Sequence, residues 1–576
     1  MLYRTYFCLY LLWIPVLSSQ VIDPFEEDTL NIFYDEFVCD EKNIIETVGL
    51  SEPCEGTSHT SPTPPSPPPS TPCGVLLSRP SIPPMNTPNP NTDLVPFIFI
   101  NNTGLPDSSI YILIYGYPVV GGVVQPGLEY VGFGPQPGPV TTTGTYVPIT
   151  ASQTPPTTQY SYQLSNIPLT GGQAILYIPY LSSGIILFSY EEPLDLVVSP
   201  GSIAVPIATD SGDSAYYTIY SGMELTFYPP GFEIDSLVQN QLTVDFTCVD
   251  YFGSPIYFNM FTQNPAPGLP QNRPSGIYQS RHYTLCSLQN TLATATAGNA
   301  RTQWEGLVLN DGSTILRVVS PGYSMTNEGG TFDAQYLDNE ASYGFSWAND
   351  VWNGTNPYYG SAKGNTLQTT VTGDYGTAVY AGSINASQQF QFATTQVLFN
   401  KEVFTIPWVN VGSHDPSIQG TTAGIMRTGV VLPGMTYTSS IQTTPIDLST
   451  SPGSAPAGVL DRAVKITKYF CSAITVSLIP GRVTSISTTG FLPNVIANYY
   501  STNTFLNPPG PTTGPWYDLY SQGLLGNTAE SGNAVYTYTY DDYLYGNDPN
   551  LSVAPSQGVI DNTTNITVVL GPYTDN

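Results

Sequence analysis

Short apolar runs separated by turn residues dominate the chain from Phe97 to about Phe261. Runs such as QAILYIPYL and AYYTIYSGMELTF are rich in the branched and aromatic residues that favour strands, and Gly, Pro, Ser and Asn lie between the runs. Apolar positions that recur at every second residue are typical of strands with two different faces. Residues 96–265 are therefore predicted to form a mostly β domain.

Longer stretches with helical texture appear after Arg281. HYTLCSLQNTLATATAG and LDRAVKITKYFCSAITVSL have the length of helices, whereas STILRVVSPG has the texture of a strand. Residues 266–529 are predicted to form a mixed α/β domain. The segment 530–576 is strand-like again, and we expect it to return to the first sheet. The predicted fold class is mainly β with an α+β part.

The N-terminal part of the chain differs from the rest in its residue composition. Residues 1–19 combine Arg4, a short apolar stretch, and the small residues Ser18 and Ser19, which is the pattern of a signal peptide. Residues 20–95 are acidic at first and then proline-rich, as in SPTPPSPPPSTP, which predicts a disordered arm and linker. No second long apolar stretch follows, so the mature protein is expected to be secreted, extracellular or in the cell wall, without membrane insertion.

The excess of acidic over basic residues limits the classes of molecule that the protein can bind. Asp and Glu together number 43 against 14 Lys and Arg, which gives a formal net charge of −29. Such a surface repels nucleic acid and anionic lipid, because both need basic side chains to meet their phosphates. A neutral polymer such as a glucan is not repelled. The 41 tyrosines are expected mainly to pack in sheets, with a minority available to stack on sugars.

Cysteines and histidines argue against a structural metal site. Cys8 leaves with the signal peptide, and the sequence does not choose among the possible pairings of the six cysteines that follow it. There is no CxxC motif and the three histidines are scattered, so no metal and no zinc site is expected. The remaining cysteines are Cys39, Cys54, Cys73, Cys248, Cys286 and Cys471. Acceptors for N-linked glycans occur at Asn101, Asn353, Asn385, Asn550, Asn562 and Asn565.

Carboxylates are the residues most able to carry chemistry in this chain. None of the histidines stands in a nucleophile-elbow context, and no phosphate-binding GxxxxGK[ST] pattern is present. Glycoside hydrolysis needs two carboxyl groups, one protonated to donate to the leaving oxygen and one ionised; in inverting enzymes the ionised group activates a water. Most acidic residues lie on solvated surface or cap turns, so their place in the apolar pattern has to separate the candidates.

Glu224 departs from the pattern of an ordinary surface acid. Alternation along its run places it on a polar face, opposite an apolar one. The apolar face holds Tyr217, Ile219, Met223, Leu225 and Phe227, and the polar face holds Thr218, Tyr220, Glu224 and Thr226. Partial desolvation among hydroxyls and an aromatic ring would raise the carboxyl pKa, as a general acid requires. The plain alternative is a solvent-facing Glu on a strand.

Asp250 ends the run LTVDFTCVDYFGSPI. Thr243, Asp245 and Thr247 share one face of that run, and strict alternation places Asp250 on the opposite face. For Asp250 to lie on the same side as Thr247, the strand has to end or bulge near Cys248. A pair formed by Glu224 and Asp250 therefore depends on a strand end at this point.

At these two runs the chain resembles glycoside hydrolase family 64, the laminaripentaose-producing β-1,3-glucanases, whose N-terminal part is related to thaumatin. FINNTG followed by IYILIYG is similar to the opening hairpin of that family, and MELTF with LTVDFTCVDYFGSPI is similar to its two catalytic segments. RVVSPGYSM, FDAQYLD, GFSWAND and YTYTYDDYLYG follow in the family's order. The resemblance covers most of Phe97 to Tyr573.

The resemblance implies an inverting endo-β-1,3-glucanase with Glu224 as general acid and Asp250 as general base. It also implies a thaumatin-like β-sandwich or barrel domain and a mixed α/β domain that flank a wide groove, with no metal and no cofactor. The substrate would be a β-1,3-glucan such as laminarin, curdlan or wall glucan. The family's substrate-binding positions fall on Thr226, Tyr228, Thr243 and Thr247. Tyr228 replaces an Asn of the family pattern and Thr243 replaces a Trp.

Two alternatives stay open at this point. A non-catalytic, glucan-binding thaumatin-like cell-wall protein would keep the groove while the altered substrate positions abolish turnover. Retention of both Glu224 and Asp250 argues against that interpretation. A tyrosine-rich structural surface protein would have strands without a groove.

Overall fold

The computed structural model of the chain describes residues between 72 and 573, with gaps. Division of the chain by its contacts gives the units Met1–Thr63 and Pro64–Asn576, and every described residue belongs to the second unit. The expected signal peptide and most of the acidic, proline-rich arm therefore lie outside the described residues. The main further gaps are 83–90, 149–160, 343–366, 407–430, 476–484, 487–517, 527–534, 536–550 and 554–562.

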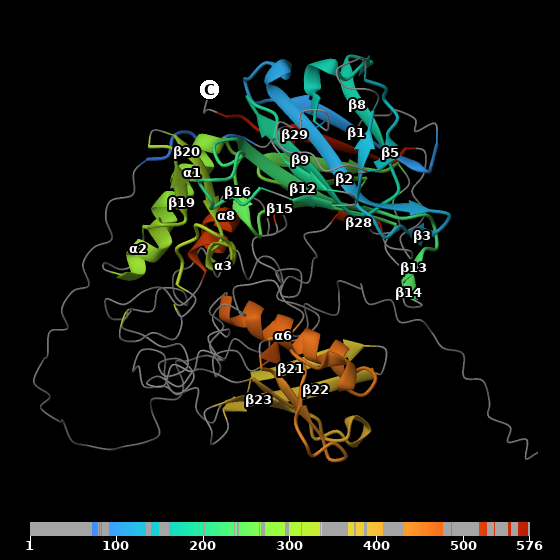
Figure 1. The fold of residues 1–576 in the computed structure, drawn as a ribbon, viewed down its shortest axis with the longest axis vertical. Coiled ribbons are helices and arrows are strands. Elements are labelled where there is room, and N and C mark those ends of the chain that lie inside the picture. The colour runs from blue at the N-terminus through green and yellow to red at the C-terminus, as the bar shows by residue number, and fades with distance from the viewer. Residues whose placement is uncertain are drawn as a thin grey trace, which may run out of the picture. The chain divides into compact units, whose positions relative to one another are not determined.

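Two large sheets face each other, and most of their strands come from residues 96–265, the part of the chain that was predicted to be mostly β (Figure 1). The first has the order β18 (Asn272–Gly276), β17 (Ile256–Phe261), β29 (Asn565–Leu570), β1 (Leu94–Asn101), β8 (Gln173–Pro179) and β7 (Leu169–Thr170). The second has the order β28 (Leu551–Val553), β15 (Leu242–Thr247), β12 (Ile219–Phe227), β9 (Leu181–Tyr190), β2 (Ile110–Val120), β4 (Glu129–Gly132) and β5 (Thr145–Pro148), with β3 (Val123–Val124) and β6 (Tyr162–Gln163) paired to β2. The fold is thus mainly β, as the sequence predicted.

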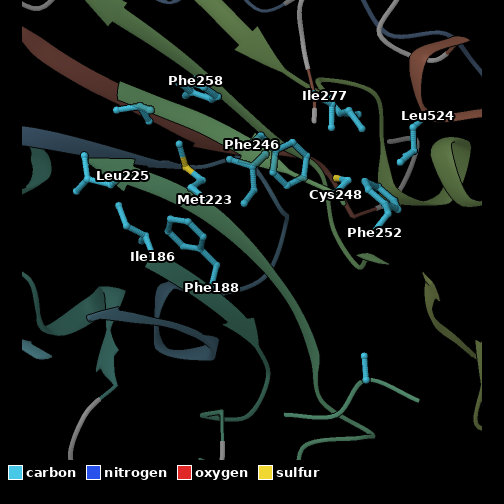
Figure 2. Close-up of a cluster of buried hydrophobic side chains, with 14 of the residues drawn as sticks. Ile186, Phe188, Met223, Leu225, Phe246, Cys248, Phe252, Phe258, Ile277 and Leu524 are labelled. Carbon is cyan, nitrogen blue, oxygen red and sulfur yellow. The ribbon is translucent and has the colours of Figure 1, made fainter. Parts of the chain in front are cut away.

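Alternating apolar side chains from both sheets form the core between them. On β12, Met223 and Leu225 point into this core, and Figure 2 shows them beside Ile186 and Phe188 of β9. Phe99 of β1 meets Phe188 edge-on across the two sheets, with ring centroids 6.0 Å apart. Burial of such side chains stabilises the fold by roughly 1.5–3 kcal/mol each.

The expected opening hairpin is not a hairpin. β1 pairs with β29 and β8, whereas β2 pairs with β9 in the other sheet, so the connection between β1 and β2 crosses from one sheet to the other. The amide of Asn101 donates to the Leu105 carbonyl at 2.8 Å and to Asp107 at 2.7 Å, which closes the turn. Alternation predicts that both runs are strands but carries no information on which sheet each run joins.

The C-terminal strand lies in the sheet of the first strand. β29 runs parallel to β1 and antiparallel to β17. The sequence pattern placed a return to the first sheet within 530–576, and β29 is the described part of that segment that pairs with it. Asn565, one of the six glycan acceptors, is fully buried at the start of β29, and its amide donates to the Thr563 carbonyl. Its side chain is therefore inaccessible to glycosylation in the folded protein.

A smaller sheet and four of the described helices lie outside the two large sheets. The sheet has the order β16 (Tyr251–Phe252), β20 (Ile315–Val319) and β19 (Val308–Asn310), and the helices are α1 (Arg281–Leu292), α2 (Asn299–Glu305), α3 (Pro321–Thr326) and α8 (Leu519–Gly526). Ser280 and Ser320 cap α1 and α3 with their hydroxyls. Cys73 and Cys286 form a disulfide, which attaches the segment before β1 to α1. The sequence had left this pairing open.

Residues between 367 and 486 form a seven-stranded sheet with one long helix. Its order is β26 (Ile446–Asp447), β25 (Thr436–Thr438), β24 (Val403–Ile406), β23 (Phe390–Ala393), β22 (Gly376–Ile384), β21 (Leu367–Gly373) and β27 (Ser485–Ile486), and the helix is α6 (Val459–Thr475). The remaining short elements are β10 (Val197–Ser199), β11 (Ser202–Ala204), β13 (Glu233–Ile234), β14 (Leu237–Val238), η2 (Asp107–Ser109), η4 (Leu164–Asn166), η6 (Val397–Phe399) and η8 (Pro452–Ser454).

A buried ion pair links α6 to this sheet. Arg462 donates through two nitrogens to the Glu402 carboxylate, at 2.9 and 2.6 Å. The Tyr380 hydroxyl donates to the same carboxylate at 2.7 Å, and both charged side chains are buried. Because each carboxylate oxygen has a charged or hydroxyl partner, the desolvation cost of the pair is offset while it stays intact.

Arg462→Ala is expected to destabilise this part of the protein by about 3–5 kcal/mol, because it leaves the Glu402 carboxylate buried without its cation. Amide hydrogen exchange in β22, β24 and α6 measures the change. The matched control is Lys465→Ala on the same helix, which breaks a partly exposed pair with Asp461 and should cost no more than about 1 kcal/mol. Equal effects of the two variants would contradict a special contribution of the buried pair.

Candidate active site

The strands β12 and β15 bring four of the six predicted site residues onto one face of the second sheet. In their antiparallel register, Glu224 lies opposite Asp245, Thr226 opposite Thr243, and Gly222 opposite Thr247. Directly opposed residues of antiparallel strands project from the same face. Glu224, Thr226, Thr243 and Thr247 therefore share the face that points away from the core, and Met223, Leu225 and Phe246 point into the core (Figure 2).

Two residues of the predicted alternation, Tyr217 and Thr218, lie outside the strand. β12 begins at Ile219, and Tyr217 precedes it in a turn with 62% of its side chain exposed. Tyr217 was expected on the apolar face with Ile219 and does not belong to it. The turn that ends at Thr218 interrupts the strand, and alternation has no meaning outside a strand.

Glu224 combines solvent exposure with a raised pKa. Its side chain is exposed, yet the surrounding protein atoms desolvate the carboxyl, and this is the main cause that raises its pKa. The negative charge of Asp250 raises the Glu224 pKa further, whereas a hydrogen bond from the Thr247 side chain lowers it. The carboxyl is thus biased towards its protonated form and still accessible to a ligand.

Asp250 lies just beyond the strand end that its position in the sequence pattern requires. β15 ends at Thr247, Val249 and Asp250 form a bend, and β16 begins at Tyr251. The Asp250 carboxyl is exposed, and desolvation raises its pKa. Its charge acts on Glu224, so the two carboxyls stand within electrostatic reach of each other despite the strict alternation that would separate them.

The four predicted substrate contacts differ in accessibility. Thr226, Thr243 and Thr247 are partly exposed on the same face as Glu224. Tyr228 is only 7% exposed, because its ring stacks on Phe232 at 4.3 Å between centroids. The hydroxyls of Tyr228 and Ser182 form a hydrogen bond of 2.9 Å. The assignment of these residues to substrate stays a prediction, and for Tyr228 little surface is available.

Strand order adds residues that the sequence analysis did not select. Across the sheet, Tyr115 of β2 pairs with Ile185 of β9, which pairs with Glu224, which pairs with Asp245. Burial is the main cause that raises the pKa of the Tyr115 phenol, and the negative charge of Glu224 raises this pKa further. Asp245 is buried, so a third carboxyl lies directly beside the predicted acid. Tyr115 is remote from Glu224 in sequence, and only the order of the strands reveals their proximity.

A buried arginine supports the start of β12. Arg317 of β20 donates to the carbonyls of Tyr216 at 2.6 Å and Thr218 at 2.7 Å, and to the Tyr220 hydroxyl at 3.2 Å. Its guanidinium also lies 4.5 Å from the centre of the Tyr220 ring, within cation–π distance. The sequence places Arg317 in a strand-like run without indicating this role.

Neither metal sites nor membrane-spanning helices are found in the described part of the chain. Among these residues, no group of three or more His, Cys, Asp or Glu side chains is arranged to hold a metal ion. The helices that the structure describes are all too short or too polar to cross a membrane.

Comparison with solved structures gives several matches of low sequence identity. A laminaripentaose-producing β-1,3-glucanase in complex with laminaritetraose matches with 16% identity and a TM-score of 0.49, over 84% of this chain and 99% of that chain. A β-1,3-glucanase domain of family 64 from Clostridium beijerinckii matches with 15% identity and a TM-score of 0.46, over 84% and 100%. A family 64 enzyme from Paenibacillus barengoltzii, complexed with laminarihexaose, matches with 12% identity and a TM-score of 0.43, over 84% and 76%.

No curated protein matches the chain. The family model described as Beta-1,3-glucanase (Glyco_hydro_64) matches residues 130–420, just over half of the chain, and the matched segment includes both Glu224 and Asp250. The chain therefore belongs to glycoside hydrolase family 64, a family of β-1,3-glucanases.

Proposed function

We propose that the chain is a secreted endo-β-1,3-glucanase that acts by inversion, with Glu224 as general acid and Asp250 as general base. The observation that carries this proposal is the placement of two exposed carboxyls, Glu224 on β12 and Asp250 just after the end of the neighbouring strand β15. Desolvation and the charge of Asp250 favour the protonated form of Glu224. Glycoside hydrolysis needs one carboxyl that can donate a proton beside one that can accept a proton, and a raised pKa suits Glu224 to the donor role.

In the proposed reaction, the Glu224 carboxyl donates its proton to the glycosidic oxygen while the bond from that oxygen to the anomeric carbon breaks. Asp250 takes a proton from a water molecule, and the water oxygen forms the new bond to the anomeric carbon from the opposite side. The product that keeps the glycosidic oxygen therefore carries the proton of Glu224. The product that keeps the anomeric carbon carries the hydroxyl of water. Proton transfer back from Asp250 to Glu224 through solvent restores the enzyme.

Several finer features belong to the same proposal. Thr226, Thr243, Thr247 and Tyr228 would contact the glucan. The family match supports a β-1,3-glucan as the substrate, and laminarin, curdlan or wall glucan is the proposed polymer. The thaumatin-like character of the two facing sheets, the wide groove and secretion through the segment 1–19 are further parts of the proposal. The reaction as written needs water and two carboxyls but no cofactor.

The test of the function is hydrolysis of laminarin and curdlan by the mature protein, followed through new reducing ends. Cleavage within the chain, seen as a rapid fall in polymer length, is the expected result. A protein that binds both glucans without releasing reducing ends would support the non-catalytic binding alternative. A protein that neither binds nor cleaves them would contradict the proposed substrate class.

Thr247→Val is expected to move the alkaline limb of the kcat/KM profile to higher pH. Activity requires protonated Glu224, so activity falls as pH rises through the pKa of Glu224. The Thr247 hydrogen bond stabilises the ionised carboxylate and lowers this pKa, so its removal raises the pKa. A series of kcat/KM values from pH 3 to about pH 9 measures the shift. Thr243→Val, on the same strand face but opposite Thr226, is the control and should leave the limb in place.

A further inference from the structure

The connection between β15 and β16 holds Asp250 outside any strand. Its backbone is restrained at three points within the described part of the chain. The Cys248 carbonyl accepts a hydrogen bond of 2.6 Å from the Tyr520 hydroxyl, and the Asp250 carbonyl accepts one of 2.8 Å from the Ser320 amide. Tyr251 then pairs with Val319 of β20. Two of these restraints are made by backbone groups, and the one to Cys248 is made by a side chain.

Tyr520 lies in the first turn of α8, and contacts of this helix fix the position of its ring. Asp518 caps α8, since its carboxylate accepts hydrogen bonds from the Tyr520 amide at 2.9 Å and from the Ser521 hydroxyl at 2.7 Å. At Gly523 the helix approaches α1 so closely that an added Cβ would lie 2.7 Å from a Leu288 methyl carbon. The Tyr520 ring is fully buried. Leu524 of the same helix belongs to the buried cluster that also contains Phe252 and Cys248 (Figure 2).

We propose that Tyr520 is a positioning residue for Asp250. Its hydroxyl donates to the Cys248 carbonyl and thereby sets the direction of the backbone between the end of β15 and Asp250. This inference rests on the proposed role of Asp250 as general base. Tyr520 and Cys248 are 272 residues apart in the chain, and Tyr520 lies outside the segment 130–420 that the family model matches.

A general base needs its carboxylate within hydrogen-bond distance of the attacking water, so a small displacement of the carboxylate lowers turnover. A misplacement of about 1 Å can lower turnover by about 10²-fold. The hydrogen bond to Cys248 lies two residues before Asp250, on the side where β15 ends, and the restraint from Ser320 acts on Asp250 itself. Loss of the first restraint frees the connection to pivot about the second. Turnover should then fall while glucan binding, which uses the strand face, persists.

The test replaces Tyr520 by Phe, which keeps the buried ring and removes the donor. On laminarin we expect kcat to fall by about tenfold to 10²-fold, with KM changed by less than about twofold. Rates are normalised to the active fraction found from glucan-binding stoichiometry in calorimetry. Tyr336→Phe is the matched control, because Tyr336 is also fully buried and its hydroxyl accepts a hydrogen bond from Trp304. The control should keep the kcat of the wild type.

A double-mutant cycle separates positioning from general destabilisation. If Tyr520 acts through Asp250, Tyr520→Phe costs little further activity in an Asp250→Asn background. An equal loss in both backgrounds, or an unchanged kcat in the single variant, would overturn the inference. Full activity of Asp250→Asn alone would instead remove the proposed base, whatever Tyr520→Phe does.

Crystal structures of the wild type and Tyr520→Phe give a readout that needs no activity. The expected difference is a displaced Cys248–Asp250 connection with β12 and β15 unchanged. An Asp250 carboxylate in the same place in both structures would refute the positioning role even if neither protein cleaved glucan.

Discussion

Glu224→Gln is expected to lower kcat on laminarin by about 10²- to 10⁴-fold, the usual contribution of general acid catalysis. The amide keeps the size of the side chain but has no acidic proton for the leaving oxygen. Binding of glucan should persist, because the neutral amide resembles the protonated carboxyl. A glucoside with an activated aryl leaving group needs little protonation, so the loss should be much smaller on such a substrate.

Glu129→Gln is the matched control for this experiment. Glu129 lies on β4 of the same sheet, and desolvation raises its pKa as well, but the charge of Asp250 does not contribute to that shift. The control variant should retain the activity of the wild type. Equal losses for both substrates in Glu224→Gln, or comparable losses in the control, would contradict the acid role.

Asp250→Asn is expected to lower kcat by about 10²- to 10⁴-fold as well. The amide cannot take a proton from water, and Asp250 is the only general base in the proposed mechanism. Asp250→Ala provides a sharper form of the test. Azide needs no base to attack, so added azide should restore bond cleavage and give a glycosyl azide with inverted configuration. An azide product of retained configuration, or full activity of Asp250→Asn, would contradict the base role.

Local pattern in the sequence predicted the face of Glu224, whereas the choice of Asp250 came from the resemblance to family 64. Alternation along MELTF places Glu224 opposite the core face, and the structure has that arrangement, because a half-buried strand fixes which face each residue joins. The strand end required for Asp250 is also present after Thr247. The resemblance to family 64 agrees with the family match. The catalytic roles themselves stay predictions.

Long-range relationships could not be predicted in the same way. The proximity of Tyr115 to Glu224 depends on the order of β2, β9 and β12, and the assignment of β1 and β2 to different sheets was missed for the same reason. The hydrogen bond from Tyr520 to Cys248 and the disulfide between Cys73 and Cys286 both join segments more than 200 residues apart. Periodicity describes one element at a time, and such pairings are decided only when the whole chain packs.

The anomeric configuration of the first product tests the central claim most directly. Proton NMR during the first minutes of laminarin hydrolysis distinguishes the newly formed α-anomer from the β-anomer before the two equilibrate. Water delivered by Asp250 on the face opposite the leaving oxygen that Glu224 protonates gives the α-anomer first. An initial product with the β-anomeric configuration would mean that the bond configuration is retained, and it would contradict the pairing of Glu224 as acid with Asp250 as base.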